Sequence, residues 1–262
     1  MMSNHETGFR NWFDQDGQAY ARLRPEYPEQ LVTFLTSVSP DTGLAVDIGC
    51  GSGQLTKLLA YHYASVIGLD ASADQLEHAA HGERIRYQQA NAEALPLGDH
   101  GVDLITCAQA AHWFDLPRFY DEVRRVCRDY GIVALITYGV PTLPAPLNER
   151  FRRFYDDEIG PFWPAERKLV DSGYAALDFP FEEILAPELD IRLDWNLTEF
   201  LGYIATWSAV KRANEAGKSD ILQAFAHEFA DAWGDADSRR VITWPLNVRV
   251  GRVRAEGAVE PA

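Results

Sequence analysis

The 262-residue sequence has few cysteines and no long apolar run. Its three cysteines, Cys50, Cys107 and Cys127, are too few and too scattered for a disulfide framework or a Cys-x-x-Cys metal site. An odd number of thiols suits a reducing compartment. No stretch approaches the roughly 18 apolar residues of a membrane span, and residues 1–30 carry charges without an apolar signal segment. We therefore expect a cytoplasmic protein with no metal site and no membrane partner.

Basic residues are also in short supply. The chain has 24 Lys and Arg against 39 Asp and Glu, which gives a formal net charge of -15. A phosphate backbone needs a clustered basic face for tight binding, so this balance disfavours DNA and RNA as partners. The length allows one large domain, or one domain with a substantial insertion. A small molecule is the expected partner, and nothing in the sequence indicates the oligomeric state.

The most informative motif in the sequence is a glycine-rich segment at residues 45–55. Residues 45–55 read AVDIGCGSGQL, an apolar run ending in an acid, then glycines at alternate positions, then a helix-like pattern. This order predicts a buried strand that turns sharply into a helix. Glycine permits positive φ and lets a ligand approach the main chain without meeting a Cβ atom. A glycine-rich turn without a ligand is the alternative that the pattern alone leaves open.

The spacing of the glycines separates two classes of ligand. The dinucleotide fingerprint G-x-G-x-x-G would need a third glycine at position 54, where this chain has Gln54. A nicotinamide-dependent reductase is therefore disfavoured. Asp47 lies near the end of the predicted strand, where a carboxylate suits an ammonium group better than a pyrophosphate.

Strand-like and helix-like segments alternate from residue 44 to residue 138. The predicted strands are 44–48, 65–69, 85–89, 102–107 and 131–138, and the predicted helices are 53–62, 72–80 and 117–129. Such alternation is typical of a parallel, doubly wound sheet with right-handed crossovers. Ligands of these sheets bind at the carboxyl ends of the strands. Asp70 ends the second strand, where a carboxylate can accept both hydroxyls of a ribose.

The alternation of strand-like and helix-like segments ends after residue 140. Three prolines in residues 141–146 indicate a loop there. Beyond this loop the pattern predicts helices over 147–159, 198–213 and 219–233, strands over 181–185 and 189–193, and an antiparallel last strand over 241–250. Thr198 and Ser219 are the expected N-caps of the two late helices. Pro245 implies an edge or a bulge in the last strand.

Several of these segments resemble class I S-adenosylmethionine-dependent methyltransferases. D-x-G-x-G-x-G at 47–53 resembles motif I of that family, and ANAEALP at 90–96 resembles the loop that holds the adenine edge. A-H-W-F-D at 111–115 is similar to motif IV of the small-molecule subgroup that includes trans-aconitate methyltransferases. Y-x-R-x-R-P-x-Y-P at 20–28 resembles an N-terminal segment that folds over the cofactor, although a plain helix pair covering the sheet would explain it equally well.

The resemblance implies an α/β fold with a doubly wound, mostly parallel, seven-stranded, Rossmann-like sheet, an antiparallel last strand and a helical cap insertion. It implies S-adenosyl-L-methionine as cofactor and S-adenosyl-L-homocysteine as product. The implied domains are an N-terminal segment over the cofactor (1–40), the cofactor-binding core (41–140), a cap and substrate region (141–236), the last strand or strands (237–254) and a disordered tail (255–262).

The resemblance also implies the site residues. For the cofactor these are Asp47, Gly49, Cys50, Gly51, Gly53, Gln54, Asp70, Ala71, Asn91, Ala92, Glu93, Gln109, Tyr20 and Arg24. Glu93 would serve equally well as a helix-start acid that complements the helix dipole. The expected substrate pocket consists of His112, Trp113, Phe114 and Trp163.

His112 is the only candidate base that these motifs place, and a purely structural histidine is the alternative. The expected function is methyl transfer to a small-molecule acceptor, most readily to an oxygen of a carboxylate or a hydroxyl. C-methylation of a quinone-type ring is the runner-up among enzymes. A non-catalytic protein that binds S-adenosylmethionine is the alternative outside enzymes, because methyl transfer leaves no obligatory catalytic signature.

Overall fold

The computed structural model describes residues 25–79 and 81–254. The chain divides into two compact units. Of the described residues, the sheet unit contains 26–79, 81–141, 165–192 and 243–254, and the helical unit contains 25, 142–164 and 193–242. The chain leaves the sheet unit after residue 141, returns to it at 165–192, and leaves it a second time before the last strand.

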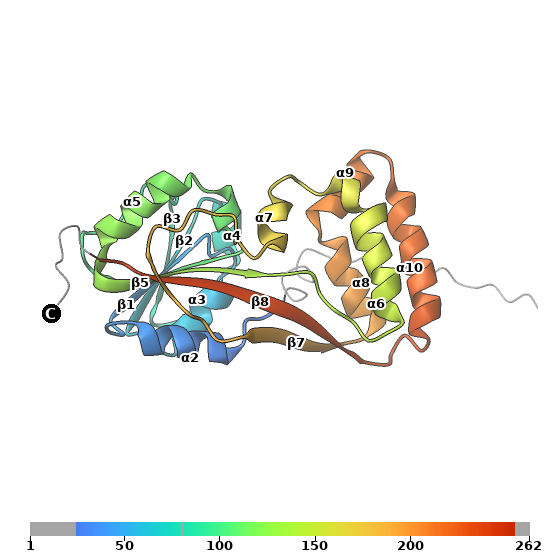
Figure 1. The fold of residues 1–262 in the computed structure, drawn as a ribbon, viewed down its shortest axis with the longest axis horizontal. Coiled ribbons are helices and arrows are strands. Elements are labelled where there is room, and N and C mark those ends of the chain that lie inside the picture. Colours follow the sequence, from blue (N-terminus) through green and yellow to red (C-terminus); the bar gives the residue numbers. More distant parts are fainter. Residues whose placement is uncertain (1–24, 80, 255–262) are drawn as a thin grey trace, which may run out of the picture. The chain divides into compact units, whose positions relative to one another are not determined.

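An eight-stranded sheet organises the sheet unit (Figure 1). The strands are β1 (Leu44–Ile48), β2 (Ser65–Asp70), β3 (Ile85–Gln89), β4 (Val102–Ala108), β5 (Cys127–Tyr138), β6 (Glu182–Ile184), β7 (Leu189–Trp195) and β8 (Arg240–Arg252). Their order is β3-β2-β1-β4-β5-β8-β6, and β7 pairs with β8.

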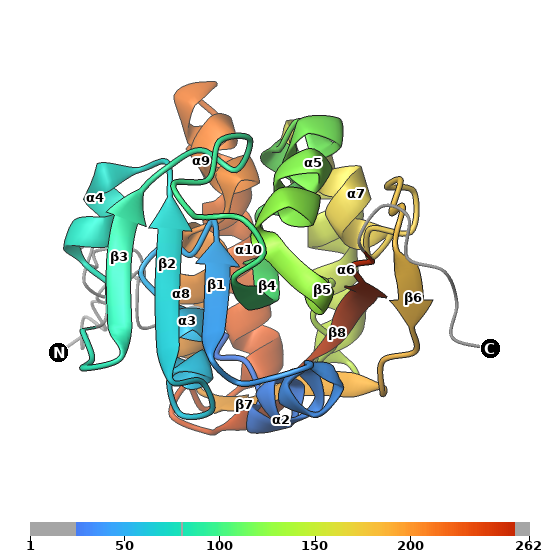
Figure 2. The same ribbon diagram turned by 90° about the vertical axis from the view of Figure 1, so that its left-hand side faces the viewer.

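The sheet is mixed but mostly parallel. Strands β1 to β5 pair in parallel, β8 runs antiparallel to β5, and β6 runs antiparallel to β8. In Figure 2 the arrows of β1, β2 and β3 point the same way. The predicted fold class is confirmed, with eight strands in place of seven because both 182–184 and 189–195 form strands.

Helices cover both faces of the parallel part of the sheet. In Figure 1, α2 (Glu29–Val38) and α3 (Gln54–Leu59) lie on one face and α5 (Leu116–Val126) lies on the other. The sheet unit also contains α4 (Ala73–Glu77), α7 (Arg167–Asp171) and the 3₁₀ turn η1 (Ala111–Trp113). Covering both faces explains why six successive residues of β4, Val102 to Cys107, are buried rather than every second one.

The end of α5 differs from its predicted position. The sequence predicts a helix over 117–129 and a strand from 131, but α5 ends at Val126 and β5 begins at Cys127. Cys127 has an extended backbone and pairs with Val102 of β4. Strand pairing, a long-range interaction, overrides the local helical pattern at these residues.

Aromatic packing builds the helical unit. Its helices are α6 (Leu147–Arg153), the π-helical turn η2 (Phe154–Glu158), the 3₁₀ turn η3 (Gly160–Phe162), α8 (Leu197–Ala205), α9 (Ser208–Glu215) and α10 (Ser219–Trp233). Phe154 stacks on Phe225 with ring centroids 4.0 Å apart, and Phe200 stacks on Phe229 at 5.2 Å.

Three predictions for the helical unit are wrong. The single helix over 198–213 is two helices, because Trp207 has an extended backbone and its indole packs against Phe151 and Tyr155. The N-cap of α8 is Asn196, which forms a capping box with Glu199, rather than Thr198. Ser219 is the first residue of α10, not its cap.

Residues 165–192, which the sequence analysis grouped with the cap, belong to the sheet unit. Three sets of contacts hold them there. The Tyr120 hydroxyl donates to the carbonyl of Asp178 (2.7 Å), and the Arg249 guanidinium donates to the carbonyls of Tyr174 (3.1 Å) and Leu177 (2.7 Å). Strand β6 adds its pairing with β8. This return of the chain brings side chains from residue 165 onward next to the core sheet.

Candidate functional site

The carboxyl ends of the parallel strands gather the predicted cofactor residues at one edge of the sheet. The glycine turn follows β1, Asp70 ends β2, Asn91 follows β3, and Gln109 follows β4. Parallel pairing requires these ends to lie on the same edge. Tyr20 and Arg24 lie outside the described residues.

The three glycines of the turn have different surroundings, although all have positive φ. A Cβ atom on Gly49 would lie 2.4 Å from the Cβ of Ala110, and one on Gly53 would lie 2.0 Å from the hydroxyl of Tyr87. A Cβ on Gly51 would meet nothing nearer than the Gln75 side-chain oxygen at 3.5 Å. Gly49 and Gly53 are therefore required by packing within the protein. Only the open space at Gly51 fits a ligand that approaches the backbone.

Asp47 lies beneath the turn rather than on its surface. Its side chain is 1% exposed, and its oxygens accept hydrogen bonds from the hydroxyls of Thr56 (2.7 Å) and Thr106 (2.8 Å). Burial raises the pKa of this carboxyl group from 3.8 to about 6, although both threonines act in the opposite direction. Asp47 thus ties α3 to β4. Its contact with an ammonium group remains a prediction.

Asp70 connects the glycine turn to the segment that leads into α4. One carboxylate oxygen accepts from the backbone N–H of Gly51 and the other from that of Ser72, both at 2.8 Å. Each oxygen retains a second lone pair, so the carboxylate can also accept the hydroxyls of a ribose. Ala71 is exposed, and its carbonyl accepts from the Gln89 side chain.

Cys50 and Gln54 complete the turn. The Cys50 thiol is half-buried and lies 3.6 Å from the Gly51 carbonyl oxygen. Burial raises its pKa, and Asp47 and Asp70 add to the shift, so the thiol is protonated at neutral pH. Gln54 is the first residue of α3. The side chain of Tyr87, which the sequence analysis did not consider, packs against Gly53 and Gly68 and shapes the turn from the β3 side.

The loop after β3 contains the predicted adenine-binding residues. Asn91 is exposed and Ala92 is buried, whereas the half-buried Glu93 accepts a hydrogen bond from the backbone N–H of Asp115 (2.9 Å). Because Asp115 is the N-cap of α5, Glu93 connects this loop to the start of that helix. The observed partner of Glu93 is the protein itself, and its contact with a cofactor remains a prediction.

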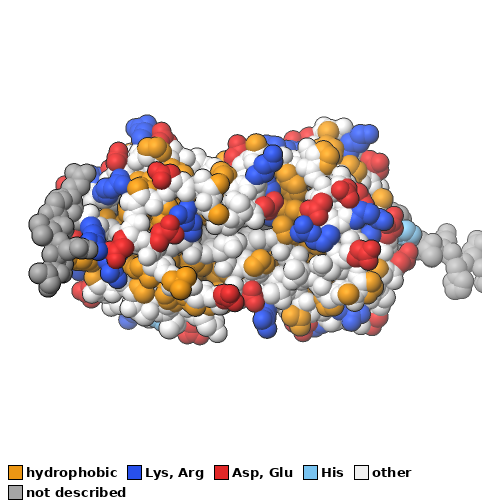
Figure 3. Space-filling model, viewed as in Figure 1, with side chains coloured by type: hydrophobic (Ala, Val, Ile, Leu, Met, Phe, Trp, Pro, Cys, Tyr) orange, Lys and Arg blue, Asp and Glu red, His pale blue; other side chains and the backbone are white. Residues whose placement is uncertain are grey.

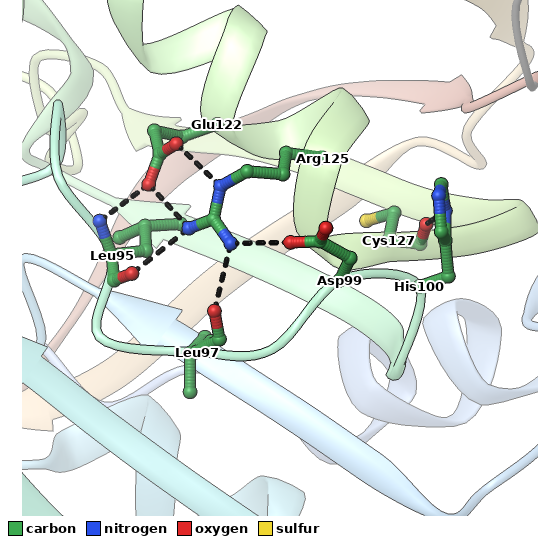
Figure 4. A network of polar contacts seen from close by, with 7 residues as sticks. All are labelled: Leu95, Leu97, Asp99, His100, Glu122, Arg125 and Cys127. Carbon is green, nitrogen blue, oxygen red and sulfur yellow. Dashed lines mark hydrogen bonds and ion pairs between the residues drawn. The ribbon is translucent and has the colours of Figure 1, made fainter.

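An arginine on α5 holds the next part of the same loop (Figure 4). All five N–H groups of the Arg125 guanidinium are used, on both oxygens of Glu122, on Asp99, and on the carbonyls of Leu95 and Leu97. Glu122 also accepts the backbone N–H of Leu95 at 2.6 Å, and its pKa is lowered mainly by Arg125. Sequence reasoning missed this cluster, because Arg125 reads as an ordinary residue on the polar face of a helix.

The segment after β4 brings His112 close to the turn. Gln109 has a φ of 56° and directs the chain toward η1. Ala110 and Phe114 are the nearest neighbours of Gly49, which packs this segment against the glycine turn. His112 is half-buried, whereas Trp113 is 63% exposed. Phe114 also packs edge-on against Phe119 at 5.1 Å.

His112 has a specific partner that its sequence neighbourhood does not reveal. Its Nδ1 atom lies 2.8 Å from the hydroxyl of Tyr174, which is fully buried. Burial lowers the pKa of His112 to about 4, and Arg167 lowers it further whereas Glu166 acts in the opposite direction. The imidazole is therefore neutral at pH 7 and can accept or donate a hydrogen bond without carrying charge.

Trp163 lies in the helical unit, where it packs against Tyr155 (5.2 Å) and Trp207 (5.3 Å). Its role in a substrate pocket remains a prediction. In the described chain, no three His, Cys, Asp or Glu side chains are arranged to hold a metal ion. None of the helices found in that same part is both long and apolar enough to cross a membrane.

Charges of both signs are interspersed on the face drawn in Figure 3, where Lys and Arg side chains stand beside Asp and Glu. The described ion pairs include Arg150 with Glu158 and Glu228, and Arg249 with Glu183. On this face, the described Lys and Arg side chains form no continuous basic area.

Comparison with known proteins assigns the fold and this site to one family. Residues 46–135 match the family model of a methyltransferase domain. A methyltransferase-family protein of Dictyostelium discoideum is 32% identical over 247 residues, which cover 92% of this chain and 94% of that protein. A Saccharomyces cerevisiae protein named as an S-adenosylmethionine-dependent methyltransferase is 31% identical over 145 residues, 51% of this chain and 50% of that protein.

A solved structure shows the same similarity. The structure of an Anaeromyxobacter dehalogenans protein, titled as a type II methyltransferase, is 39% identical and has a TM-score of 0.83. The match covers 89% of this chain and 99% of that one. The glycine turn with its open position at Gly51 and the carboxylate of Asp70 fit the cofactor of this family. The chain therefore belongs to the class I methyltransferases that use S-adenosylmethionine as cofactor.

Proposed function

We propose that this methyltransferase acts on a small molecule and transfers the methyl group to an oxygen atom. The observation that carries the proposal is the position of His112. It follows β4 at the carboxyl edge of the sheet, two residues after Ala110, which abuts the glycine turn. A neutral, half-buried imidazole beside the cofactor turn can contact an acceptor and handle its proton.

The residues that would hold the cofactor are those of the carboxyl edge. The main chain at Gly51 would lie against the cofactor, Asp70 would accept its ribose hydroxyls, and the loop at Asn91 and Ala92 would border its adenine. When bound, S-adenosylmethionine supplies a methyl carbon on a positively charged sulfur, already activated for displacement. The protein then needs chiefly to orient an acceptor and to exclude water.

The net charge of the chain and the charges on its surface bear on the size of the acceptor. A net charge of -15 and interspersed surface charges disfavour long polyanions, which leaves small organic molecules as the favoured class. The resemblance of residues 111–115 to the trans-aconitate subgroup suggests a carboxylate acceptor, which needs no base. A hydroxyl acceptor does need one, so the position of His112 favours a hydroxyl. C-methylation of a quinone-type ring is the runner-up to both.

The test is incubation of the enzyme with S-adenosylmethionine and separate libraries of carboxylic acids, phenols, alcohols and quinones. S-adenosylhomocysteine release and the mass of each product are measured. We expect methylation of an oxygen in at least one library, and loss of turnover in His112→Gln. The control is His62→Gln, which changes another half-buried histidine, three residues beyond the end of α3. Products methylated only on carbon would refute the proposal.

A further inference from the structure

A tyrosine of β3 fills the space that a glycine of β2 leaves empty. The two strands lie side by side (Figure 2), and Tyr87 pairs in register with Gly68. A Cβ atom on Gly68 would lie 2.6 Å from the Cδ1 and Cε1 atoms of the Tyr87 ring. The ring therefore occupies the place where a side chain of residue 68 would stand. An aromatic ring laid across a strand glycine supplies the packing that the glycine lacks.

The same side chain reaches the far end of the glycine turn. A Cβ atom on Gly53 would lie 2.0 Å from the Tyr87 hydroxyl oxygen and 2.9 Å from the Cζ atom that carries it. Gly53 is buried and is the N-cap of α3, with a φ of 81°. The half-buried Tyr87 thus spans the distance from the middle of β2 to the start of α3.

Hydrogen bonds connect Gly53 to the rest of the turn. Its N–H donates to the Cys50 carbonyl (2.9 Å), and its carbonyl accepts from the N–H of Lys57 in α3 (3.0 Å). The N–H of Cys50 donates in turn to the Leu69 carbonyl at the end of β2 (3.0 Å). Gly51, the open position of the turn, lies between Cys50 and Gly53 in the sequence. A displacement of Gly53 would therefore also move the main chain at Gly51.

Cys50 meets Tyr87 at Gly68. A Cβ atom on Gly68 would lie 3.0 Å from the Cys50 Sγ atom, in addition to its contacts with the Tyr87 ring. Gly68 thus gives room to two side chains, one from the turn and one from β3. Tyr87 consequently contacts the glycine turn region at two places, beside Cys50 and beside Gly53.

We propose that Tyr87 positions the glycine turn for S-adenosylmethionine, by fixing Gly53 so that the main chain at Gly51 stays open to the cofactor. A binding site of this kind needs its groups held to within about 0.5 Å by well-packed neighbours. Tyr87 acts through the turn and is a positioning residue. Its role concerns the cofactor alone, so it does not depend on which acceptor is methylated.

A positioning role differs measurably from a purely structural one. A tyrosine that only filled the core would contribute to the free energy of unfolding, and its loss would leave the affinity of the folded protein unchanged. A tyrosine that positions the turn also changes the dissociation constant of the cofactor in the folded protein. The readout is therefore binding, measured where urea unfolding shows that each variant is folded.

The first test is Tyr87→Leu, which removes the ring but keeps an apolar side chain in β3. Calorimetry measures the affinity of the variant for S-adenosylhomocysteine. We expect it to fall at least about tenfold, because a turn displaced by a fraction of an ångström no longer fits the cofactor.

The control is Tyr63→Leu, which removes a fully buried ring at the other end of β2. Tyr63 precedes β2 by two residues, and its hydroxyl lies 2.7 Å from the Ser39 Oγ atom. This variant should lose stability, whereas its affinity for S-adenosylhomocysteine should equal that of the wild type.

The second test combines Gly53→Ala with Tyr87→Phe. Burial raises the pKa of Tyr87 to about 12, so Tyr87→Phe removes no charge at pH 7. It removes the oxygen atom that a Cβ on Gly53 would meet first. Gly53→Ala should therefore reduce the affinity for S-adenosylhomocysteine at least about threefold less in the Tyr87→Phe background than in the wild type. The strain of a positive φ is present in both backgrounds and cancels.

Each test has an outcome that would overturn the proposal. A folded Tyr87→Leu variant that binds S-adenosylhomocysteine within about twofold of the wild type would show that Tyr87 is only structural. If Tyr87→Leu does not fold, the combination of Gly53→Ala and Tyr87→Phe decides. Additive effects of these two substitutions on affinity would show that Tyr87 does not act through Gly53.

Discussion

At the scale of single residues, the ionisation of Asp47 makes the free energy of unfolding depend on pH. Its folded-state pKa, about 6, lies above the ordinary value of 3.8 because burial opposes the charge. An acid whose pKa is raised by folding favours the folded state while it is protonated, and this contribution is lost as the pH rises from 3.8 through about 6. Ionised Asp47 is thus a cost that the protein carries at neutral pH.

Asp47→Asn should remove this dependence, because the amide does not ionise. Relative to the wild type, the free energy of unfolding of the variant should rise by about 3 kcal/mol between pH 3.5 and pH 7.5. Urea unfolding over this pH range measures the difference. A difference between variant and wild type that stays constant with pH would show that Asp47 does not titrate as described.

A substitution at Gly51 tests whether the cofactor lies against the main chain of the glycine turn, because a Cβ atom at this position would enter open space. Gly51→Ala should fold with a strain of about 1–2 kcal/mol from its positive φ, yet lose at least about tenfold in affinity for S-adenosylhomocysteine. Calorimetry measures the affinity. The matched control is Gly217→Ala, which also has positive φ and no neighbour within 4 Å but lies in the helical unit.

Gly49→Ala should behave differently from both variants. Its Cβ atom would lie 2.4 Å from that of Ala110, so the main loss should be in stability. Wild-type affinity in a folded Gly51→Ala variant would contradict the assignment of Gly51 to the cofactor. The sequence predicted the three glycines as a group. It could not show which one is open, because Tyr87 lies in β3 and Ala110 in the segment after β4.

At the scale of elements, Arg125 decides whether the loop after β3 keeps its shape. Arg125→Met keeps the length of the side chain but removes five hydrogen bonds to Glu122, Asp99 and the loop carbonyls. It should cost about 2–4 kcal/mol in stability, because the loop carbonyls and Glu122 lose their donors. Hydrogen exchange of residues 95–99 should quicken, and the affinity for S-adenosylhomocysteine should fall.

Arg124→Met is the control for this prediction. Arg124 lies on the same helix but pairs with Asp121, which is 80% exposed, across 3.4 Å. An exposed pair of this kind contributes about 0–1 kcal/mol. Equal effects of the two substitutions on exchange in residues 95–99 would contradict the role given to Arg125.

Sequence periodicity located the strands of the parallel sheet well, since β1 and β3 match their predicted bounds. It failed where a distant partner decides a boundary. Pairing of Cys127 with Val102 ends α5 early, and packing of Trp207 into the aromatic cluster splits the predicted helix over 198–213. Neither partner can be read from the local pattern.

At the scale of the whole molecule, the path of the chain decides what reaches His112. The proline-rich loop at residues 141–146 indicated that the chain leaves the sheet unit. The sequence did not predict that residues 165–192 belong to the sheet unit again. That return brings Tyr174 to His112 across 62 positions of sequence. The motif around His112 was therefore predictable, whereas its hydrogen-bond partner Tyr174 was not.

The most direct test of the account uses acceptors that carry a hydroxyl and a carboxylate in one molecule. The enzyme is incubated with a set of such hydroxy acids and S-adenosylmethionine with a deuterated methyl group, and mass spectrometry and NMR locate the label. We expect label on the hydroxyl oxygen, and a decrease of about 10²–10⁴ in its rate of appearance for His112→Gln. Label on the carboxylate or on carbon, at a rate independent of His112, would contradict it.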